Sequence, residues 1–406
     1  MNLHSVPDFF LTRYPLLPVP SKYEKVDCPA GVTILIPGSV TPVCREGDTV
    51  YAGQPLAEQR LPGTFASCCG KVVGIVPRQR SEGVTVTAVA IEKRVSDKEP
   101  YRLFDPIENV SDASAEELYE NLQMAGCALR RDDRPLLIRC IDGDCEAVTN
   151  RWYVERQFNR ILQGIEMLQK LSPDSRLIVA VPETLSADKK MQLAGKTAVL
   201  EVKPHYPAVT TKQIIVSDSV LKNADRIGMM DCSRLVELMF TLETGCSAFT
   251  QKVLVKSGPK QTARFFEVPI GISVGDLLVH AGINVEPGSR VIFGGRMTGR
   301  AVDDLSQPIT TDDTAVMCVP PGDVVLSENV SCVNCGRCVR ACPVGLRVDL
   351  IAKCVEFSHF DEAYRLGVMQ CIDCGCCSAA CIVHRPLAYH CFFAKKERAN
   401  RSGADG

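Results

Sequence analysis

The chain has 406 residues, of which 46% are hydrophobic and 23% are charged, with a formal net charge of −2. This composition supports several buried cores, and the near-neutral charge argues against a nucleic-acid-binding protein. No apolar run approaches the roughly 20 residues of a membrane span, and the first residues lack the pattern of a secretory signal. We therefore expect several folded domains, no transmembrane segment, no signal peptide and no nucleic-acid partner.

After an N-terminal extension at 1–30, residues 31–97 contain short runs of alternating apolar and polar side chains, separated by glycines and prolines. This pattern is typical of a small all-β unit. The segments REGDTVYAGQPLAE and GKVVGIV are similar to those of lipoyl-type barrel-sandwich folds. The carrier lysine of those folds lies in a hairpin turn, whereas Lys71 begins a predicted strand, so we interpret Lys71 as structural.

Residues 98–248 indicate an α/β domain. Ser114 and Glu117 form a capping box, which predicts a helix that ends near Gly126. The short apolar segments PLLIRC, RLIVAVPE and AVLEV alternate with helical segments, and this alternation predicts a parallel sheet. Residues 151–171 predict a single amphipathic helix. Its apolar face carries Trp152, Phe158, Ile161, Ile165 and Leu168.

Residues 249–325 predict a small α+β unit of the β-grasp type. Residues 265–270 and 290–293 are predicted strands, and the segment VGDLLVHAG is a predicted helix. A glycine-rich turn, GGRMTG, follows at 294–299.

Cysteine is the unusual residue of this chain, which contains 21 of them. In the absence of a secretory signal, so many cysteines favour metal binding over disulfides. Residues 326–398 contain two C-x2-C-x2-C-x3-C motifs, the spacing of two-cluster ferredoxins, in which the fourth cysteine of each motif binds the other cluster. Zinc is the alternative, but structural zinc sites usually use two separated cysteine pairs. We predict two [4Fe–4S] clusters, one held by Cys332, Cys335, Cys338 and Cys381, and the other by Cys371, Cys374, Cys377 and Cys342.

The remaining thirteen cysteines fit no ligand set, and we interpret them as small buried apolar side chains. Cys376 lies inside the second motif but matches Arg337 of the first, so it is not predicted to be a ligand. A third metal centre is the alternative for this group. The segment PLAYHCFFAKKERAN, residues 386–400, predicts a terminal helix with a basic end, and residues 399–406 are assigned to a tail.

The chain resembles the C subunits of Rnf-type ion-translocating electron transport complexes. The segments that carry the resemblance occur in the same order: the β unit, IRCIDGDCEA, VPIGISVGDLLVHAGI, VIFGGRMTGRAVDDLSQPIT and the cysteine motifs with RPLAYHCFFAKKE. The resemblance covers roughly residues 31–398, and cobalamin reductases of propanediol metabolism are a second similar family. It implies a multidomain α/β and α+β chain. The implied domains are a barrel-sandwich hybrid at 31–97, a Rossmann-like α/β domain of the complex I flavin-subunit type at 98–248, an SLBB β-grasp domain at 249–325 and a two-cluster ferredoxin-like domain at 326–398.

The nucleotide site of that family begins with a glycine-rich loop, because backbone N–H groups must reach phosphates without intervening side chains. Here the corresponding loop reads QMAGCALRRDDRP and contains one glycine, Gly126. Arg130, Arg131 and Arg134 follow and could pair with phosphates. Basic loop residues are, however, mostly solvated, and their bulk fills the space that a flavin needs.

The later features of the family's site are partly kept. Its acidic turn is present as Asp144, Cys145 and Glu146, and we take Asp144 and Glu146 as remnants of a cofactor-binding site. A further stretch of the family's site lacks its glycine and glutamate here and is represented by Tyr206, Pro207, Val209, Thr211 and Lys212. We therefore expect two [4Fe–4S] clusters and no bound FMN or NADH.

These observations predict a peripheral iron–sulfur subunit of an Rnf-type membrane complex on the cytoplasmic side. It would pass single electrons through its clusters without oxidising NADH and without catalytic residues of its own; whether it is itself an enzyme stays open. The expected partners are other subunits of the complex and a redox protein, namely a ferredoxin, a cytochrome or another iron–sulfur protein. The alternatives are an NADH-oxidising FMN/iron–sulfur subunit, a cobalamin reductase-like microcompartment protein, and a protein in which the clusters are only structural.

Overall fold

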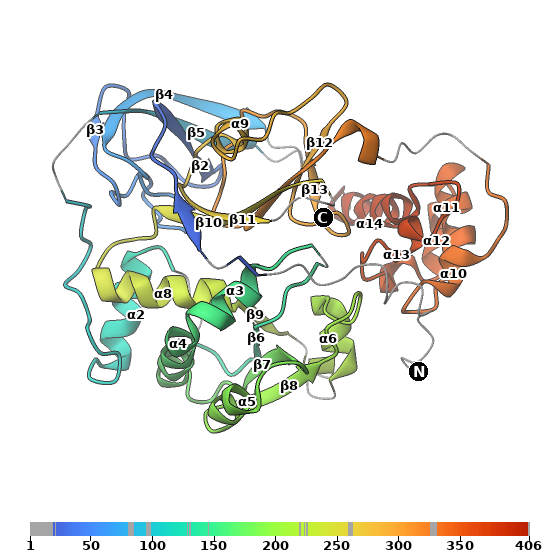
Figure 1. Ribbon diagram of the computed structural model, residues 1–406, viewed down its shortest axis with the longest axis horizontal. Coiled ribbons are helices and arrows are strands. Elements are labelled where there is room, and N and C mark those ends of the chain that lie inside the picture. Colours follow the sequence, from blue (N-terminus) through green and yellow to red (C-terminus); the bar gives the residue numbers. More distant parts are fainter. Residues whose placement is uncertain are drawn as a thin grey trace.

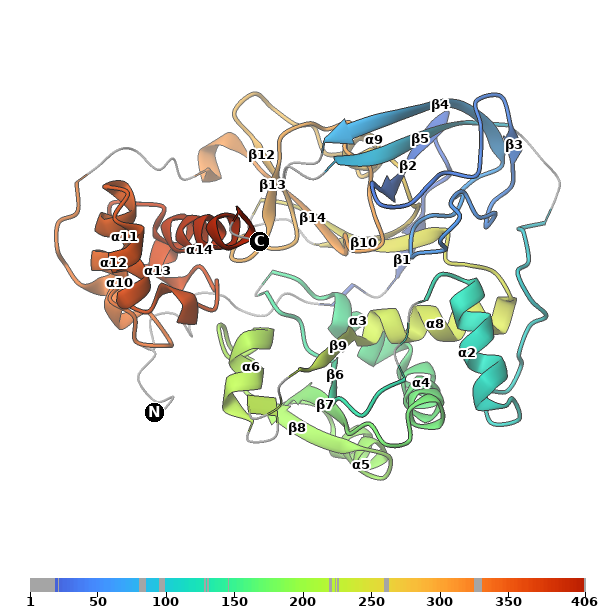
Figure 2. The same cartoon turned by 180° about the vertical axis from the view of Figure 1, so that it is seen from behind.

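Figure 1 shows the computed structural model of the chain, and Figure 2 shows it from behind. Two β units form one layer, an α/β unit lies against them, and a helical unit with the cysteine motifs lies at one end. The structure describes residues 19–20, 22–79, 85–94, 99–127, 129, 131–144, 146–218, 221–222, 224, 226–258, 263–324 and 331–404.

The first β unit is a four-stranded antiparallel sheet in the order β2-β5-β4-β3. Alternate residues of β2 are buried, as the sequence pattern predicts for a strand with one face on a core. Lys71 lies in β4 opposite Thr49, in a strand as expected. The strands are β2 (Gly31–Pro37), β3 (Thr49–Val50), β4 (Gly70–Gln79) and β5 (Thr85–Lys93).

The α/β unit contains a parallel four-stranded sheet, as predicted, in the order β8-β7-β6-β9. The chain proceeds from β6 through β7 to β8 on one side and then adds β9 on the other side of β6. The strand order therefore reverses between β6 and β9, the position where open α/β sheets bind ligands. The strands are β6 (Leu136–Arg139), β7 (Leu177–Pro182), β8 (Ala198–Val202) and β9 (Gly228–Asp231). The helices are α2 (Ala115–Met124), α3 (Thr149–Arg156), α4 (Phe158–Leu171), α5 (Ala187–Ala194), α6 (Thr211–Ser217) and α8 (Cys232–Thr244).

The helices of this unit confirm one prediction and correct another. Ser114 caps α2 by accepting a hydrogen bond from the backbone N–H of Glu117. The single helix predicted over 151–171 is wrong, because Gln157, with φ −129° and ψ 26°, separates α3 from α4. The break changes the direction of the chain. Both α3 and α4 pack against α8, and Trp152 of α3 also stacks on Phe265 of another sheet.

The third sheet has six strands in the order β1-β11-β10-β14-β12-β13. Its first strand comes from the N-terminal extension and pairs in parallel with β11, a contact that the sequence did not predict. The predicted strands at 265–270 and 290–293 and the helix between them are confirmed. The elements are β1 (Tyr23–Lys25), β10 (Thr250–Ser257), β11 (Arg264–Pro269), α9 (Val274–His280), β12 (Arg290–Phe293), β13 (Arg300–Val302) and β14 (Ala315–Val319), followed by the 3-10 turn η2 (Pro321–Asp323).

The helical unit contains both cysteine motifs around a small apolar core of its own. The predicted C-terminal helix is confirmed as α14. No helix in the described part of the chain combines the length and the apolar character of a membrane span. The elements are α10 (Arg337–Arg340), α11 (Val348–Glu356), α12 (Phe360–Arg365), η3 (Val368–Gln370), α13 (Cys376–Ala379) and α14 (Leu387–Ala404).

Gly126, the one glycine of the candidate nucleotide loop, packs against the first β unit. Its φ is +79°, and a Cβ atom there would lie 2.9 Å from the backbone carbonyl of Leu61 and from the ring of Phe65. Glycine is needed here because another part of the chain approaches the backbone. The space next to this glycine is therefore filled by protein.

Replacing Gly126 with alanine tests this packing. The left-handed conformation costs about 1 to 2 kcal/mol for an L-residue, and the clash with Leu61 adds about 1 to 3 kcal/mol of overpacking. Gly282→Ala is the matched control, because its φ is +68° but no atom lies within 4 Å of the added Cβ. Urea unfolding should therefore show a lower midpoint for Gly126→Ala than for Gly282→Ala, and equal midpoints would contradict the contact.

Candidate metal centres and the adjoining cleft

The two cysteine motifs form loops of the same conformation. Each residue of the first motif has a counterpart 39 positions later, as Cys332 and Cys371 show (371 − 332 = 39). Asn334 and its counterpart Asp373 have φ angles of 54° and 57°. The glycines of the two loops, Gly336 and Gly375, have φ angles of 69° and 72°. The sequence repeat is therefore also a structural repeat.

Backbone N–H groups point at the sulfur of the first and last cysteine of each motif. Such hydrogen bonds favour the thiolate, the form that binds iron, and they tune a bound cluster. The N–H···Sγ distances are 3.4 Å for Asn334 to Cys332, 3.4 Å for Asp373 to Cys371, 3.3 Å for Leu346 to Cys342 and 3.4 Å for Arg385 to Cys381. This donor set fits two iron–sulfur clusters.

The last cysteine of each motif lies near the other motif. Burial raises the pKa of the Cys342 thiol, and the nearby thiols of Cys374 and Cys371 raise it further. The end of the second motif likewise lies near the first motif, because the guanidinium of Arg385, four residues after Cys381, contacts the Cys332 sulfur. This crossing is the arrangement of two-cluster ferredoxins. Within the described residues, no three metal-binding side chains converge on a point suited to a single ion.

A cleft of about 380 Å³ adjoins the second motif. It lies at the carboxyl ends of β6 and β9, where the strand order reverses. Its walls come from residues 139, 142–144, 147, 149–150, 210–212, 231, 233, 294–295, 298 and 314–315, and from Ile372 and Asp373 of the second motif. A ligand in this cleft would therefore lie beside the second cysteine loop.

The charged groups at the floor of the cleft pair with one another. Arg139 donates to the hydroxyl of Thr211 at 2.5 Å and to the carboxylate of Asp231 at 2.8 Å. The amide of Asn150 donates to the same carboxylate at 3.1 Å. Burial raises the pKa of Asp142 to about 7, although the Arg151 guanidinium opposes the shift. These pairs span the space between the two strand ends.

Asp144, which the sequence assigned to a remnant cofactor site, is bonded to the turn at 294–299. Its Oδ2 accepts hydrogen bonds from the backbone N–H groups of Met297 at 3.2 Å and Thr298 at 3.0 Å, and from the Thr298 hydroxyl at 3.0 Å. A Cβ atom at Gly295 would lie 2.0 Å from this carboxylate, so only glycine fits there. Asp144 thus joins the α/β unit to the third sheet.

Glu146, the second residue assigned to that remnant site, is buried behind the turn. It forms ion pairs with Lys256, at 3.3 Å, and with Arg296, at 2.7 Å. Burial acts to raise the pKa of Glu146, but the Arg296 guanidinium and the Lys256 ammonium outweigh it and lower the pKa. Cys145, between the two acids, lies outside the described residues.

The arginines of the candidate phosphate loop have partners within their own segment. Arg131 pairs with Glu116 at 2.9 Å and stacks on the ring of Tyr119. Arg134 pairs with Asp132. Arg130 is outside the described residues, and none of the described residues between 125 and 134 lines the cleft.

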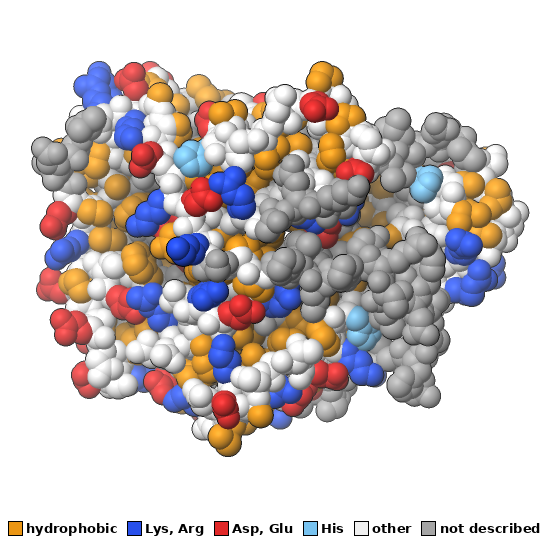
Figure 3. Space-filling view, viewed as in Figure 1, with side chains coloured by type: hydrophobic (Ala, Val, Ile, Leu, Met, Phe, Trp, Pro, Cys, Tyr) orange, Lys and Arg blue, Asp and Glu red, His pale blue; other side chains and the backbone are white. Residues whose placement is uncertain are grey.

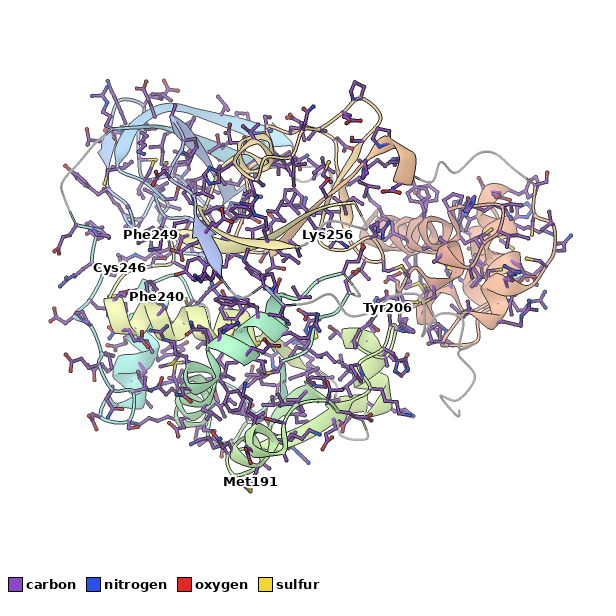
Figure 4. The ribbon with its side chains drawn as sticks, viewed as in Figure 1. Met191, Tyr206, Phe240, Cys246, Phe249 and Lys256 are labelled. Atoms are coloured by element: carbon purple, nitrogen blue, oxygen red, sulfur yellow. The ribbon has the colours of Figure 1, made fainter. Side chains whose placement is uncertain are left out.

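Sequence reasoning missed the side chains that hold the second cysteine loop. The Tyr206 hydroxyl, which lies between the α/β and helical units in Figure 4, donates to the carbonyl of Cys374. Lys212 and Lys395 both pair with Asp373, at 2.5 and 2.6 Å, and Lys395 also donates to the carbonyl of Cys371. Tyr206 and Lys212 are visible in the sequence as parts of the degraded nucleotide stretch, but Lys395 carries no local signal.

The ion pairs of Glu146 predict a pH-dependent cost of Glu146→Gln. Breaking a buried pair costs about 3 to 5 kcal/mol, because the partner charge of Lys256 stays buried. Since the folded pKa lies below the ordinary value of about 4.3, this stability is present above that value and is lost as pH falls through the folded pKa. Unfolding midpoints should therefore differ most at neutral pH and converge in acid.

Glu24→Gln is the matched control for that experiment. Glu24 pairs with Arg264 at the surface, where both side chains are about half exposed. Such pairs contribute about 0 to 1 kcal/mol. If Glu146→Gln cost no more than Glu24→Gln, the buried pair would not stabilise this junction.

Comparison with known proteins agrees with this geometry. A family model described as a 4Fe-4S dicluster domain matches residues 324–382. The chain is 23% identical to the C subunit of the Na(+)-translocating ferredoxin:NAD(+) oxidoreductase complex of Acetobacterium woodii, across 86% of this chain and 85% of that protein. It is also 23% identical to the proton-translocating counterpart of Clostridium ljungdahlii (86% and 81%) and to the C subunit of the ion-translocating oxidoreductase complex of Rhodobacter capsulatus (89% and 76%). The resemblance to C subunits and the ferredoxin-type domain are thereby confirmed.

Among solved structures, an NAD+-reducing [NiFe]-hydrogenase is similar with 14% identity and a TM-score of 0.41. The match covers 62% of this chain and spans about half, 52%, of the hydrogenase chain. A TM-score below 0.5 adds nothing to the functional argument.

Proposed function

We propose that this chain, which resembles the C subunits of ion-translocating oxidoreductase complexes over most of its length, is a peripheral electron-transfer subunit of such a complex. The observation that carries the proposal is the pair of matching cysteine loops, each with N–H groups directed at its sulfurs. When bound, [4Fe–4S] clusters accept and release single electrons. The partners would be the other subunits of the complex, on its cytoplasmic side, and a soluble redox protein.

The crossing of the two motifs supports the ligand assignment. Cys342 lies with the second loop, and the segment after Cys381 contacts the first loop. One cluster is therefore proposed to be held by Cys332, Cys335, Cys338 and Cys381, and the other by Cys371, Cys374, Cys377 and Cys342. The protein contributes burial, hydrogen bonds to the sulfurs and a fixed separation of the two sites.

Three observations support electron transfer without NADH oxidation. The space beside Gly126 is filled by Leu61 and Phe65, where a nucleotide loop needs open backbone. The carboxylates of Asp144 and Glu146 are engaged by protein groups. The backbone N–H groups of the turn at 297–298, which could otherwise face a phosphate, already donate to Asp144.

The arrangement of sheets supports a four-part chain. The proposed parts are a barrel-sandwich hybrid at 31–97, an α/β domain at 98–248, an SLBB β-grasp domain at 249–325 and a ferredoxin-like domain at 326–398. The extension at 1–30 contributes β1 to the sheet of the third part. The first three parts then act as a scaffold that positions the second cysteine loop.

One observation favours a second candidate, an NADH-oxidising FMN/iron–sulfur subunit. The cleft of about 380 Å³ lies at the reversal of strand order and borders the second cysteine loop. A redox cofactor there would be well placed to exchange electrons with that loop. The cofactor content of the purified chain separates the two candidates.

Purification without oxygen gives that content. The proposed function requires about eight irons and about eight sulfides per chain, because each cluster contains four of each. It also requires no flavin. Iron, acid-labile sulfide and flavin should be quantified together, and a stoichiometric flavin would favour the second candidate.

Two adjacent cysteines provide a matched test of the ligand assignment. Cys377→Ser removes a proposed ligand and should lower the iron content by about four, the content of one cluster. Cys376→Ser changes the preceding residue, which is 1% exposed and matches Arg337 of the first motif, and should leave the iron content unchanged. Equal iron loss in both variants would contradict the assignment.

A further inference from the structure

The two cysteine loops have the same conformation but different surroundings. The second loop is covered by the rest of the chain: Ile372 is 8% exposed, and Cys374 is 6% exposed. In the first loop, the counterpart Val333 is 54% exposed, and Cys335 is also exposed. The same structural element is therefore covered in one copy, whereas in the other copy its described residues Val333 and Cys335 are exposed.

The contacts of the second loop show how such a loop is covered. A Cβ atom on Gly375 would lie 2.7 Å from the carbonyl oxygen of Met297, so the glycine lets the turn at 294–299 approach the backbone. At the counterpart, Gly336, only the end of the flexible Arg340 side chain lies near, at 3.2 Å. The first loop has the same backbone conformation and could be approached as closely by another segment. No described residue from another part of the chain lies within 4 Å of a Cβ atom at Gly336.

The first motif carries two positive charges that the second motif lacks. Arg337 and Arg340 of the first motif stand where the covered motif has Cys376 and Ala379. Both arginines are exposed, and Arg340 donates a hydrogen bond to the backbone carbonyl of Cys335 at 3.2 Å. Figure 3 shows Lys and Arg side chains beside apolar ones at the end of the molecule formed by the helical unit. The first motif therefore presents one exposed apolar side chain, Val333, and two exposed arginines.

We propose that the first cysteine loop, Val333 to Gly336 with Arg337 and Arg340, is the docking surface for a small acidic electron-carrier protein. The inference rests on the proposed function, because it requires a redox cluster behind the loop. Electron-transfer encounters use small interfaces, and complementary charge raises their association rate. A partner with Asp and Glu around its own exposed cofactor would pair with the arginines and place its cofactor next to Cys335.

Charge reversal at Arg337 tests the proposal in the full chain with assembled clusters. The probe is a purified acidic bacterial ferredoxin, reduced photochemically, and stopped-flow absorbance gives the second-order rate constant for reduction of the chain. Arg337→Glu should lower this constant by about tenfold or more at low ionic strength, with the difference closing as salt is added. Arg337→Lys should restore most of the rate, and Val333→Glu should lower it independently.

Arg94→Glu is the matched control, since Arg94 is an exposed arginine that follows β5 in the first β unit. An unchanged rate for Arg337→Glu and Val333→Glu, or an equal loss for Arg94→Glu, would overturn the docking surface. Self-association of the chain that Val333→Glu abolishes would assign the loop to a second copy and also overturn it. Dithionite reduction, followed by electron paramagnetic resonance, distinguishes failure of the proposed function from failure of the docking surface. A chain without reducible clusters overturns the proposed function. Reducible clusters, with a rate constant that Arg337→Glu and Val333→Glu leave unchanged, overturn only the docking surface.

Discussion

The structure depends on one buried carboxylate, that of Asp144. It accepts two backbone N–H groups and one hydroxyl from the turn at 294–299, and charged acceptors of this kind contribute about 1.5 to 3 kcal/mol per hydrogen bond. The same turn contacts the second cysteine loop through the carbonyl of Met297 at Gly375. The hydrogen bonds of Asp144 therefore join the α/β unit to the turn of the third sheet that contacts the second cysteine loop.

Under the proposed function, the chain keeps an order of segments that resembles a nucleotide-dependent family and uses it without the nucleotide. The backbone N–H groups of the turn at 297–298 and the acids that line the cleft, such as Asp231 and Asp373, are paired within the protein. The glycine of the preceding loop packs against the first β unit. The scaffold fixes the second cysteine loop through Tyr206, Lys212 and Lys395. The first cysteine loop is exposed, whereas the second loop is covered by the rest of the chain.

Local patterns in the sequence were sufficient for much of this fold. The alternation of short apolar segments with helical segments predicted the parallel sheet. The cap at Ser114 predicted the start of α2, because that signal involves residues only three positions apart. Contacts between distant segments were not accessible. The break at Gln157, the pairing of β1 with β11 and the packing of Gly126 on Leu61 each depend on a partner that only the folded chain brings near. The roles of Asp144 and Glu146 belong to the same class, since their partners lie more than a hundred residues away.

The central claim is that electrons pass through this chain by its clusters alone. Adding NADH to the anaerobic chain with assembled clusters, and recording their visible absorbance, tests it most directly. The account predicts no bleaching by NADH and complete bleaching when dithionite follows. Rapid bleaching by NADH would show that the cleft still holds a working hydride-accepting site and would contradict the account.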